Sequence, residues 1–412
     1  MKPRFVSVAC DEFIPPGSLP AAAPPHMMRY QSRNPIQLAP MNFSVAVKDL
    51  AQALGRISSA TPQRSPMPVL ENILLDLDGS TLSLTATDMD ITVTTRIEVR
   101  GEGNGAILVP ARRLTDTVRA LELGELTFEA DPATRRITLH TGSGEYKLSG
   151  LDASEFPQLP RFEPTVSLSL ALSKFSGMID RTVFAVSGDE FRPAMTGVLF
   201  QFRPDQMRAV ATDGFRLVRV IDTDMVPQVG EQVDIIVPPK ALQLASKAFS
   251  ADEITLEANR THVRFADGVT TITARLIDEN YPNYEGVIPQ ANDKRMVIRR
   301  DELLNAVKRV SLYSNTQTRQ VRMKLGSSQL RIQAEDVDTG GEAYEHVPCD
   351  YSDDEMEIGF SSQFVRDALD RIDADEVTFE FSTPLRPSLI SPYGPANGQD
   401  VLMLLMPIRL NN

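Results

Sequence analysis

The segments TATDMDITVTT (residues 85–95), VATDGFRLVRV (210–220) and QAEDVDTGGEA (333–343) decide the fold, because they are three versions of one pattern. Each is typical of a strand that runs into a turn. Their alanines, the first of which is Ala86, lie 125 and then 123 residues apart. Self-similarity at a nearly fixed period indicates a repeated structural unit.

Three further elements repeat in phase with these segments. A strand and helix pattern opens each unit in FSVAVKDLAQALGRI (43–57), LSLALSKFSGMIDRT (168–182) and MVIRRDELLNAVKRV (296–310). A second helical pattern follows in VPARRLTDTVRAL (109–121), VPPKALQLASKAF (237–249) and FSSQFVRDALDRI (360–372). Related segments mark the ends of the first two units, namely SEFPQLP (154–160) and ENYPNYE (279–285). Four elements in register predict three similar domains, covering residues 41–165, 166–292 and 293–412.

Each unit is expected to be α+β, with two helices packed on one face of an antiparallel sheet. Residues 71–99 alternate apolar and polar side chains almost throughout, and Asp78-Gly79 is typical of a hairpin turn. Residues 47–57 instead show the helical spacing of apolar side chains. Helices and sheets of this kind bury their apolar faces against one another.

Residues 1–40 differ from the rest of the chain. They hold 8 of the 29 prolines and show no apolar period, so they cannot bury enough surface to offset the entropy of ordering. We expect a disordered N-terminal extension, or translation that starts at Met41. A secretory signal is not expected, because Asp11 and Glu12 break the short apolar stretch.

The composition excludes several classes of protein. The 42% apolar and 24% charged residues are typical of a globular chain. No apolar run approaches the roughly 18 residues that a membrane helix needs, so no membrane partner is expected. Two cysteines, Cys10 and Cys349, are too few for a disulfide framework and favour a reducing, cytoplasmic setting.

Charge is distributed unevenly along this acidic chain, whose net charge is −13. The predicted helices carry 15 basic and 7 acidic side chains, a net charge of +8, so the rest carries −21; the windows counted are 46–56, 110–121, 172–182, 238–249, 299–309 and 361–372. A positive surface of helices binds duplex DNA through its phosphates without reading sequence. Solvated surface cations explain the same counts equally well, but the recurrence in most units favours a function.

Enzyme chemistry and a cofactor are not expected. The four histidines are not spaced as a metal pair: His26, His140, His262 and His346. The segment GSGEYK (142–147) lacks the full phosphate-loop motif and is expected in a strand-turn-strand context. No set of residues for nucleophilic catalysis is evident.

Two Asp-x-Asp pairs leave open an enzyme that acts on nucleic acid with a divalent metal ion. Asp88/Asp90 and Asp336/Asp338 are each expected on one strand face near a turn, where solvated carboxylates are the common case. A third possibility is a protein-binding scaffold of three related domains without a DNA role. Metal-dependent turnover by the purified chain would favour the enzyme. Failure of the protein to stay on circular DNA would favour the scaffold.

The chain from Met41 to Leu410 resembles the bacterial DNA polymerase III beta subunit, the replicative sliding clamp. The resemblance is spread in order over all three units. It is carried by RSPMPVLENILL (64–75), LTATDMDI (84–91), EFPQLP (155–160), RPAMTGVLF (192–200), VATDGFRLVRV (210–220), YPNYEGVIP (281–289), EMEIGFSSQFVRDAL (355–369) and LLMPIRL (404–410).

The resemblance implies a non-catalytic processivity factor of DNA replication. Two chains would pair head to tail into a six-domain ring, a DNA clamp fold, through which duplex DNA slides. It also implies that the DNA polymerase III alpha subunit, a separate clamp loader and other clamp-binding-motif proteins are partners, and that the protein is cytoplasmic and associated with the nucleoid.

The resemblance further implies a pocket that takes a short apolar peptide motif of these partners. The matching positions are Met195, Thr212, Gly214, Phe215, Arg216, Leu217, Pro289, Leu404, Met406, Pro407, Ile408 and Arg409. Met and Leu side chains around a concavity suit varied linear motifs, although they are equally typical of a core. The chain departs from the family at Phe215, where many members have His or Tyr, and in Asn411-Asn412.

DNA contacts and a dimer seam are implied as well. Arg64 and Arg192 match family positions near the hole, and Pro193-Ala194 replaces an aromatic pair of the family. The sign and spacing of helix residues add the candidates Arg112, Arg113, Lys240, Lys247, Arg300 and Arg366. The dimer seam is expected between Tyr146 of one chain and Leu312 and Tyr313 of the other.

Overall fold

The computed structural model describes residues 40–101, 103–131, 133–159, 162–226, 232–394 and 398–410. All of them belong to a unit that spans residues 38–412. The expectations for residues 1–39, and for Asn411 and Asn412, lie outside the described residues. Below, the first, second and third repeats are the segments predicted from the sequence.

The first repeat contains two helices and ten strands among its described residues. They are β1 (Met41–Ala46), α1 (Val47–Ile57), β2 (Asn72–Asp78), β3 (Thr81–Thr87), β4 (Ile91–Glu98), β5 (Arg100–Gly101), β6 (Asn104–Pro110), α2 (Ala111–Ala120), β7 (Glu125–Asp131), β8 (Arg136–His140), β9 (Glu145–Ser149) and β10 (Leu151–Asp152). Short 3₁₀ turns lie at Ser58–Ala60, Pro68–Glu71 and Ala153–Glu155.

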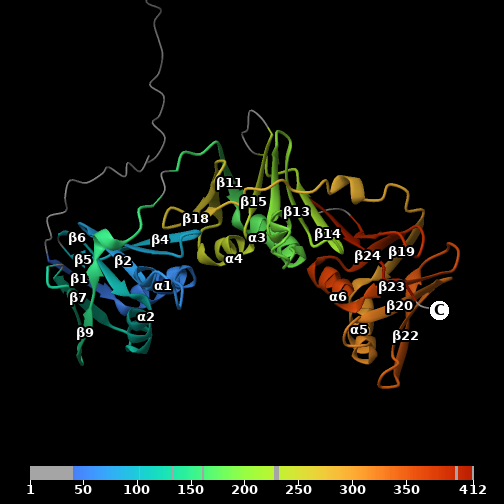
Figure 1. The fold of residues 1–412 in the computed structure, drawn as a ribbon, viewed down its shortest axis with the longest axis horizontal. Coiled ribbons are helices and arrows are strands. Elements are labelled where there is room, and N and C mark those ends of the chain that lie inside the picture. The colour runs from blue at the N-terminus through green and yellow to red at the C-terminus, as the bar shows by residue number, and fades with distance from the viewer. Residues whose placement is uncertain are drawn as a thin grey trace, which may run out of the picture. The chain divides into compact units, whose positions relative to one another are not determined.

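The second and third repeats follow the same plan. The second has β11 (Val166–Ala171), α3 (Leu172–Thr182), β12 (Val198–Arg203), β13 (Gln206–Thr212), β14 (Arg216–Asp222), β15 (Val233–Val237), α4 (Pro239–Ala248), β16 (Glu253–Ala258), β17 (His262–Ala266) and β18 (Thr270–Arg275). The third has β19 (Lys294–Arg299), α5 (Arg300–Val310), β20 (Gln320–Gly326), β21 (Gln329–Asp336), β22 (Gly341–Asp350), β23 (Met356–Ser361), α6 (Ser362–Arg371), β24 (Glu376–Phe381), β25 (Ser388–Pro392) and β26 (Gln399–Leu405). The prediction of two helices on antiparallel sheet in each repeat is confirmed, and the two helices of each repeat lie side by side (Figure 1).

The first helix of each repeat begins in the same way. None of α1, α3 and α5 has a side-chain N-cap. Instead, the first backbone N–H of each donates to a carbonyl just before a strand of its own repeat, with N···O distances of 2.8–2.9 Å; the pairs are Val47 to Gly124, Leu172 to Asp252 and Arg300 to Asp375. This contact satisfies a donor that a helix end otherwise leaves unpaired, and it ties the helix to the sheet.

Each repeat has two four-stranded sheet segments with one strand order. One segment reads β1-β7-β8-β9, β11-β16-β17-β18 and β19-β24-β25-β26 in the three repeats. The other reads β6-β2-β3-β4, β15-β12-β13-β14 and β23-β20-β21-β22. The three repeats are therefore equivalent in topology as well as in sequence spacing.

Strand pairing joins consecutive repeats. The first seam pairs β4 antiparallel to β18, with Val93 opposite Ile272. The second seam pairs β14 antiparallel to β26, with Val218 opposite Met403. Because hydrogen bonds continue across each seam, the sheets run from one repeat into the next without an edge.

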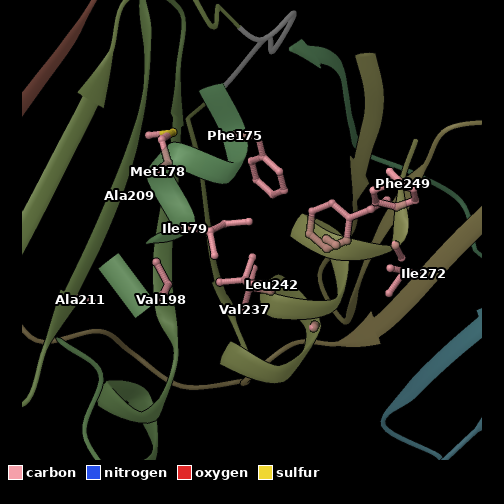
Figure 2. Packing of buried hydrophobic residues seen from close by; sticks show 14 of the residues in the cluster. Phe175, Met178, Ile179, Val198, Ala209, Ala211, Val237, Leu242, Phe249 and Ile272 are labelled. Carbon is pink, nitrogen blue, oxygen red and sulfur yellow. The ribbon is translucent and has the colours of Figure 1, made fainter. Parts of the chain in front are cut away.

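The main core of each repeat lies between its helices and its sheets. In the second repeat, Phe175 and Ile179 of α3 face Leu242 of α4 (Figure 2). The ring of Phe175 lies 5.4 Å from that of Phe265 on β17. Such aromatic contacts add to the burial of apolar area and fix the helix on the sheet.

Candidate functional site

A second apolar cluster lies apart from the main core, and we call it the outer cluster. Its buried members are Leu199, Val210, Leu217, Ile236, Tyr284, Ile288, Leu389 and Leu404. Along β12, Val198 and Phe200 belong to the main core whereas Leu199 between them belongs to the outer cluster. Since alternate residues of a strand point to opposite faces, the outer cluster lies on the sheet face that the helices leave uncovered.

The second seam assembles this cluster from two repeats. Leu217 of β14 lies directly opposite Leu404 of β26. Leu404 in turn lies opposite Leu389 of β25. Two residues that the sequence assigned to the peptide pocket are thus neighbours, although they are far apart in the chain.

The connection between the second and third repeats covers part of the cluster. The hydroxyl of Tyr284 donates to Oε1 of Gln201 at 2.7 Å, and burial raises the pKa of this phenol. Burial also raises the pKa of Tyr281, which packs against the cluster. Ile288 is buried there, and the predicted pocket residue Pro289 follows it half-buried. Neither tyrosine was predicted as a site residue from the sequence.

The turn between β13 and β14 presents Phe215 to solvent. Asp213 Oδ1 accepts the backbone N–H groups of Phe215 and Arg216 at 2.9 and 3.0 Å. The Thr212 hydroxyl donates to the Arg216 carbonyl at 2.7 Å and accepts from the N–H of Gly214. Gly214 has φ of +90°, a conformation that side chains with a Cβ rarely adopt. This rigid turn leaves Phe215 60% exposed.

Met195 and Arg192 lie beside the same turn. A Cβ on Gly214 would come within 3.0 Å of Arg192 Nη1 and 3.7 Å of Met195 Cε, so the glycine leaves room for both side chains. Met195 lies in the 3₁₀ turn Pro193–Thr196 and is 9% exposed. Arg192 Nε donates to Asp189 Oδ2 at 2.8 Å. Arg192, predicted to contact DNA, is therefore a neighbour of the predicted peptide residues.

The guanidinium group of Arg216 is bound by other residues of the same chain. Its Nη1 donates to Asp367 of α6 at 2.5 Å, its Nε to Asp213 and its Nη2 to the Phe184 carbonyl. The guanidinium carbon also lies 4.7 Å from the ring centre of Phe364. Because the side chain is only 12% exposed, it positions the turn and joins two repeats rather than offering a free cation to a ligand.

The C-terminal residues pass from the outer cluster to the third repeat. The N–H of Met406 donates to the Phe215 carbonyl, and that of Ile408 to the Gly359 carbonyl, each at 2.8 Å. Met406 is 37% exposed next to the turn that carries Phe215. Pro407 and Ile408 are half-buried, and Arg409 is exposed. Exposed Phe215 and Met406 thus border a buried apolar floor.

The predicted DNA-contact residues have varied surroundings. Arg64, Arg113 and Lys247 are exposed, as is Arg112, which lies 3.7 Å from Asp116 one helical turn along α2. Arg300 donates to the Ile372 carbonyl and pairs with Asp301, so its guanidinium already has partners within the third repeat. Arg366 is half-buried.

A hollow of about 340 Å³ brings cations of the first two repeats together. It is lined by Gly55, Arg56, Ser59, Lys240, Gln243, Leu244, Lys247 and Ala248. Arg56 of α1 donates to Ser250 at 3.0 Å, and Lys240 of α4 pairs with Asp88. Arg56 was not among the predicted DNA contacts, although its charge is one of the basic charges counted on the predicted helices.

Neither Asp-x-Asp pair lies together on one strand face, so this part of the expectation was wrong, although both pairs lie at turns. Asp88 and Asp90 lie in the turn between β3 and β4, where Asp88 Oδ1 accepts the N–H groups of Asp90 and Ile91. Asp336 ends β21, and hydrogen bonds from Thr339 and Asn315 hold its pKa below the usual range. Among the described residues, no group of three or more His, Cys, Asp or Glu is arranged to hold a metal ion. GSGEYK spans the turn after β8 and the first residues of β9, so the predicted strand-turn-strand context is confirmed.

The side chains of the predicted seam residues are exposed. Tyr146 lies on β9 and is 39% exposed. Leu312 and Tyr313, in the 3₁₀ turn Ser311–Tyr313 after α5, are 81% and 48% exposed. No helix in the described parts of the chain is long and apolar enough to cross a membrane.

Solved structures define the class of protein to which this fold is similar. A DNA polymerase sliding clamp from Pseudomonas aeruginosa has a TM-score of 0.84 and 30% identity, and the match covers 90% of this chain and 100% of that one. A sliding clamp from Bartonella birtlesii, solved bound to griselimycin, has a TM-score of 0.84, 31% identity and the same coverage. The fold is the clamp fold.

Sequence comparisons give the family. Models of the N-terminal, central and C-terminal domains of the DNA polymerase III beta subunit match residues 41–160, 169–283 and 285–409. The beta sliding clamp of Pseudomonas aeruginosa is 32% identical over 90% of this chain and all of its own length, and that of Escherichia coli is 30% identical over 90% and 100%. The chain therefore belongs to the DNA polymerase III beta subunit family, the bacterial beta sliding clamps, which are non-catalytic processivity factors of replication. This result sets aside the two alternatives of a nucleic-acid enzyme and of a scaffold without a DNA role.

Proposed function

We propose that two copies of this chain close head to tail into a ring that encircles duplex DNA and slides along it. The observation that carries this proposal is the repetition of one seam. Two seams of identical strand register join three equivalent repeats, and the edges that would form a third seam, on β9 and β22, lie at the two ends of the series. Closed two-fold symmetry satisfies both edges at once.

The cations on the helices support a sequence-independent hold on DNA. Lys240, Lys247 and Arg56 line one hollow, and the side chains of Arg113 and Lys247 are exposed. A ring need not bind tightly, because its topology retains it while phosphate contacts centre the duplex. Arg64 and Arg192 are proposed as further contacts, with Arg112, Arg300 and Arg366 retained from the charge pattern.

The outer cluster and the residues around it are proposed as the docking site for partner peptides. Exposed Phe215 and Met406 beside the buried Leu217 and Leu404 suit an apolar motif, and methionine adapts to varied partners. The partners proposed are the DNA polymerase III alpha subunit, the clamp loader and other proteins with such a motif. In the proposed ring, each of the three predicted domains is one repeated unit. The proposed location of the protein is the cytoplasm, at the nucleoid.

Retention on DNA by topology tests the proposal. The protein is loaded onto nicked circular plasmid with a clamp loader, and half of the plasmid is then linearised. Retention on circles with loss from linear DNA is expected of a sliding ring. Equal loss from both forms would show that only weak electrostatic binding occurs and would overturn the proposal.

A further inference from the structure

We propose that the third repeat binds a short chain of phosphates, such as pyrophosphate or the triphosphate of a nucleotide, on the face of β20 and β21 that points away from the core. The site is a hollow of about 190 Å³, which we call the outer hollow. It is lined by Arg322, Lys324, Arg331, Gln333 and Glu357, that is, by three cations and one carboxylate. This inference does not depend on the proposed ring, because all five residues belong to one repeat of one chain.

The alternation of the strands directs these side chains away from the core. On β20, Arg322 and Lys324 alternate with residues of the main core, so they point to the opposite face. Arg331 of β21 and Glu357 of β23 alternate with core residues in the same way, and these strands belong to one sheet segment (Figure 1). The core residues that alternate with them are Val321, Met323, Leu325, Leu330, Ile332, Met356 and Ile358.

The strand register brings the three cations together. Lys324 lies directly opposite Arg331 in the antiparallel pair of β20 and β21. Directly opposed side chains have Cβ atoms about 5 Å apart. Arg322 lies two residues along β20, which is about 7 Å in an extended strand. The three cations therefore converge on one small volume, as a compact anion requires.

Arg331 is held in place without a counter-charge. Its guanidinium carbon lies 4.4 Å from the ring centre of Tyr344, which is a cation–π contact. Its Nε is buried without a hydrogen-bond partner among the described residues. Buried donors in folded proteins nearly always have a partner, so this group indicates a missing one. An anion in the outer hollow would balance the charge of the guanidinium.

The ion pairs of the outer hollow leave a positive surplus. Arg322 Nη1 lies 2.8 Å from Glu357 Oε1. Within the described parts of the chain, neither Lys324 nor Arg331 forms an ion pair with a carboxylate. One carboxylate against three cations leaves a net charge of +2 in a chain whose total is −13. The outer hollow is thus a local positive site on an acidic protein.

The three repeats share the backbone of this site but not its charges. The repeated alanines Ala86, Ala211 and Ala334 mark one position on β3, β13 and β21, and the strand register extends the equivalence to the neighbouring strands. The corresponding residues are Leu74, Asp76 and Ser83 in the first repeat, Leu199, Gln201 and Arg208 in the second, and Arg322, Lys324 and Arg331 in the third. Because two repeats fold without this cluster, the fold does not require it.

The second repeat uses the same place for packing. Arg208 pairs with Glu285 at 2.9 Å, and Gln201 accepts from the hydroxyl of Tyr284. Leu199 belongs to the outer cluster. In the third repeat, by contrast, Lys324 is exposed, and the side chain of Arg322 is 28% exposed. The cations of the third repeat are therefore accessible to a ligand.

The charges around the outer hollow favour a short anion over a strand of nucleic acid. Glu335 and Glu342 lie opposite each other farther along β21 and β22, and both are exposed. A long polyanion laid across this face would meet these carboxylates, whereas a chain of two or three phosphates needs only the outer hollow. Arginine binds phosphate oxygens through two parallel hydrogen bonds, and lysine adds a point charge.

Titration calorimetry with tripolyphosphate tests the proposal. The probe is titrated into the full chain at low salt without divalent cations, and we expect saturation at one site per chain. ATP should compete, because it carries the same phosphate chain. Lys324→Gln and Arg331→Gln should each weaken binding by roughly tenfold or more, since each removes a charge-assisted contact. Circular dichroism checks that both variants are folded.

Arg208→Gln is the matched control. It removes an arginine from the equivalent position of the second repeat, so the affinity for tripolyphosphate should not change. Lys247→Gln tests the other cationic hollow. Loss of affinity in this variant, with none in Arg331→Gln, would place the probe among the helix cations and overturn the proposal.

Three further results would also overturn it. The first is the absence of a saturable signal in the starting chain. The second is an equal loss of affinity in Arg208→Gln and Arg331→Gln, which would show a general effect of charge. The third is displacement of the probe from the outer hollow by a short DNA duplex, which would assign this face to nucleic acid.

Discussion

The two seams share one backbone register but differ in nearly every side chain. At the first seam, neutral threonines face each other, and the hydroxyls of Thr95 and Thr270 are bonded at 3.0 Å in a buried site. At the second seam, an ion-pair network surrounds Arg216, and the outer cluster covers the face that the helices leave free.

This difference teaches how a repeated fold acquires one specific site. Backbone pairing joins the repeats in both places, and the ionic network and the outer cluster are additions found at the second seam. Those features are present where exposed Phe215 and Met406 lie, and the equivalent turn at the first seam carries Asp88, Met89 and Asp90 instead. The second seam is therefore both a joint and a candidate docking site, whereas the first is a joint beside a cationic hollow.

The largest effect is expected from Arg216→Ala. The change removes a nearly buried cation and leaves Asp213 and Asp367 without their shared partner. Loss of one member of such a buried network costs about 3–5 kcal/mol. The urea unfolding midpoint should fall markedly, with peptide binding lost as well. An unchanged midpoint would show that the second seam does not depend on this network.

A smaller loss is expected from Leu404→Ala, which opens a cavity in the outer cluster. Leu404 is 3% exposed and touches both repeats through Leu217 and Leu389. Truncation of a buried leucine costs about 2–5 kcal/mol, and this cluster lies near the surface, so we expect the lower end. Denaturant unfolding measures the change, and binding of a short apolar partner peptide should weaken in parallel. A stable variant that still binds the peptide with full affinity would contradict the assignment of this cluster.

Phe215→Ala separates docking from stability. Because the ring is 60% exposed, unfolding should shift by less than about 0.5 kcal/mol. Affinity for the partner peptide, measured by fluorescence polarisation, should fall roughly tenfold, as for an aromatic contact residue.

Met89→Ala is the matched control for Phe215→Ala. Met89 lies in the equivalent turn of the first repeat and is 55% exposed. Peptide affinity should not change in this variant. Equal losses in the two variants would mean that the peptide does not distinguish the two seams.

The double variant Thr95→Val, Thr270→Val should have little effect on stability. It replaces both partners of one buried hydrogen bond by apolar groups of the same shape, which is close to neutral. Each single variant leaves one hydroxyl unpaired and should cost about 1–2 kcal/mol. Thermal unfolding of the three variants gives the comparison, and a double variant less stable than either single one would refute it.

The smallest effect on folding is expected from Lys247→Gln in the cationic hollow. Lys247 is exposed, so stability should change by less than about 0.5 kcal/mol. Binding to linear duplex DNA should instead show a salt dependence reduced by about one phosphate contact per substituted lysine. An unchanged salt slope would remove Lys247 from the DNA-binding residues.

Much of the fold was predictable from local patterns. All six predicted helix windows contain a helix, and each observed boundary lies within one residue of the window, as with α4 at Pro239–Ala248 for the window 238–249. Apolar spacing and proline position are local properties of the chain, which explains this agreement. The equivalence of the repeats followed from spacing and reappears in the strand order.

The site was only partly predictable. The resemblance supplied Leu217 and Leu404, but Tyr281 and Tyr284 were assigned only to the boundary between units. A local signal existed, because the run VLFQF (198–202) is apolar on both faces and so indicates a strand covered on both sides. The sequence also placed Arg216 in the pocket, whereas its guanidinium is held by Asp213, Asp367 and Phe184.

The sequence by itself determined the three repeats, their helices and strands, the cationic bias of the helices and the family. Only the tertiary structure decided which strands meet at each seam and which side chains form the outer cluster. It also decided that Asp88 forms an ion pair with Lys240. The physical reason is the separation along the chain of the residues that determine each feature. Helix and strand periods are set by neighbours a few residues apart, whereas a seam is set by backbone hydrogen bonds between segments that meet only after each repeat has packed its own core.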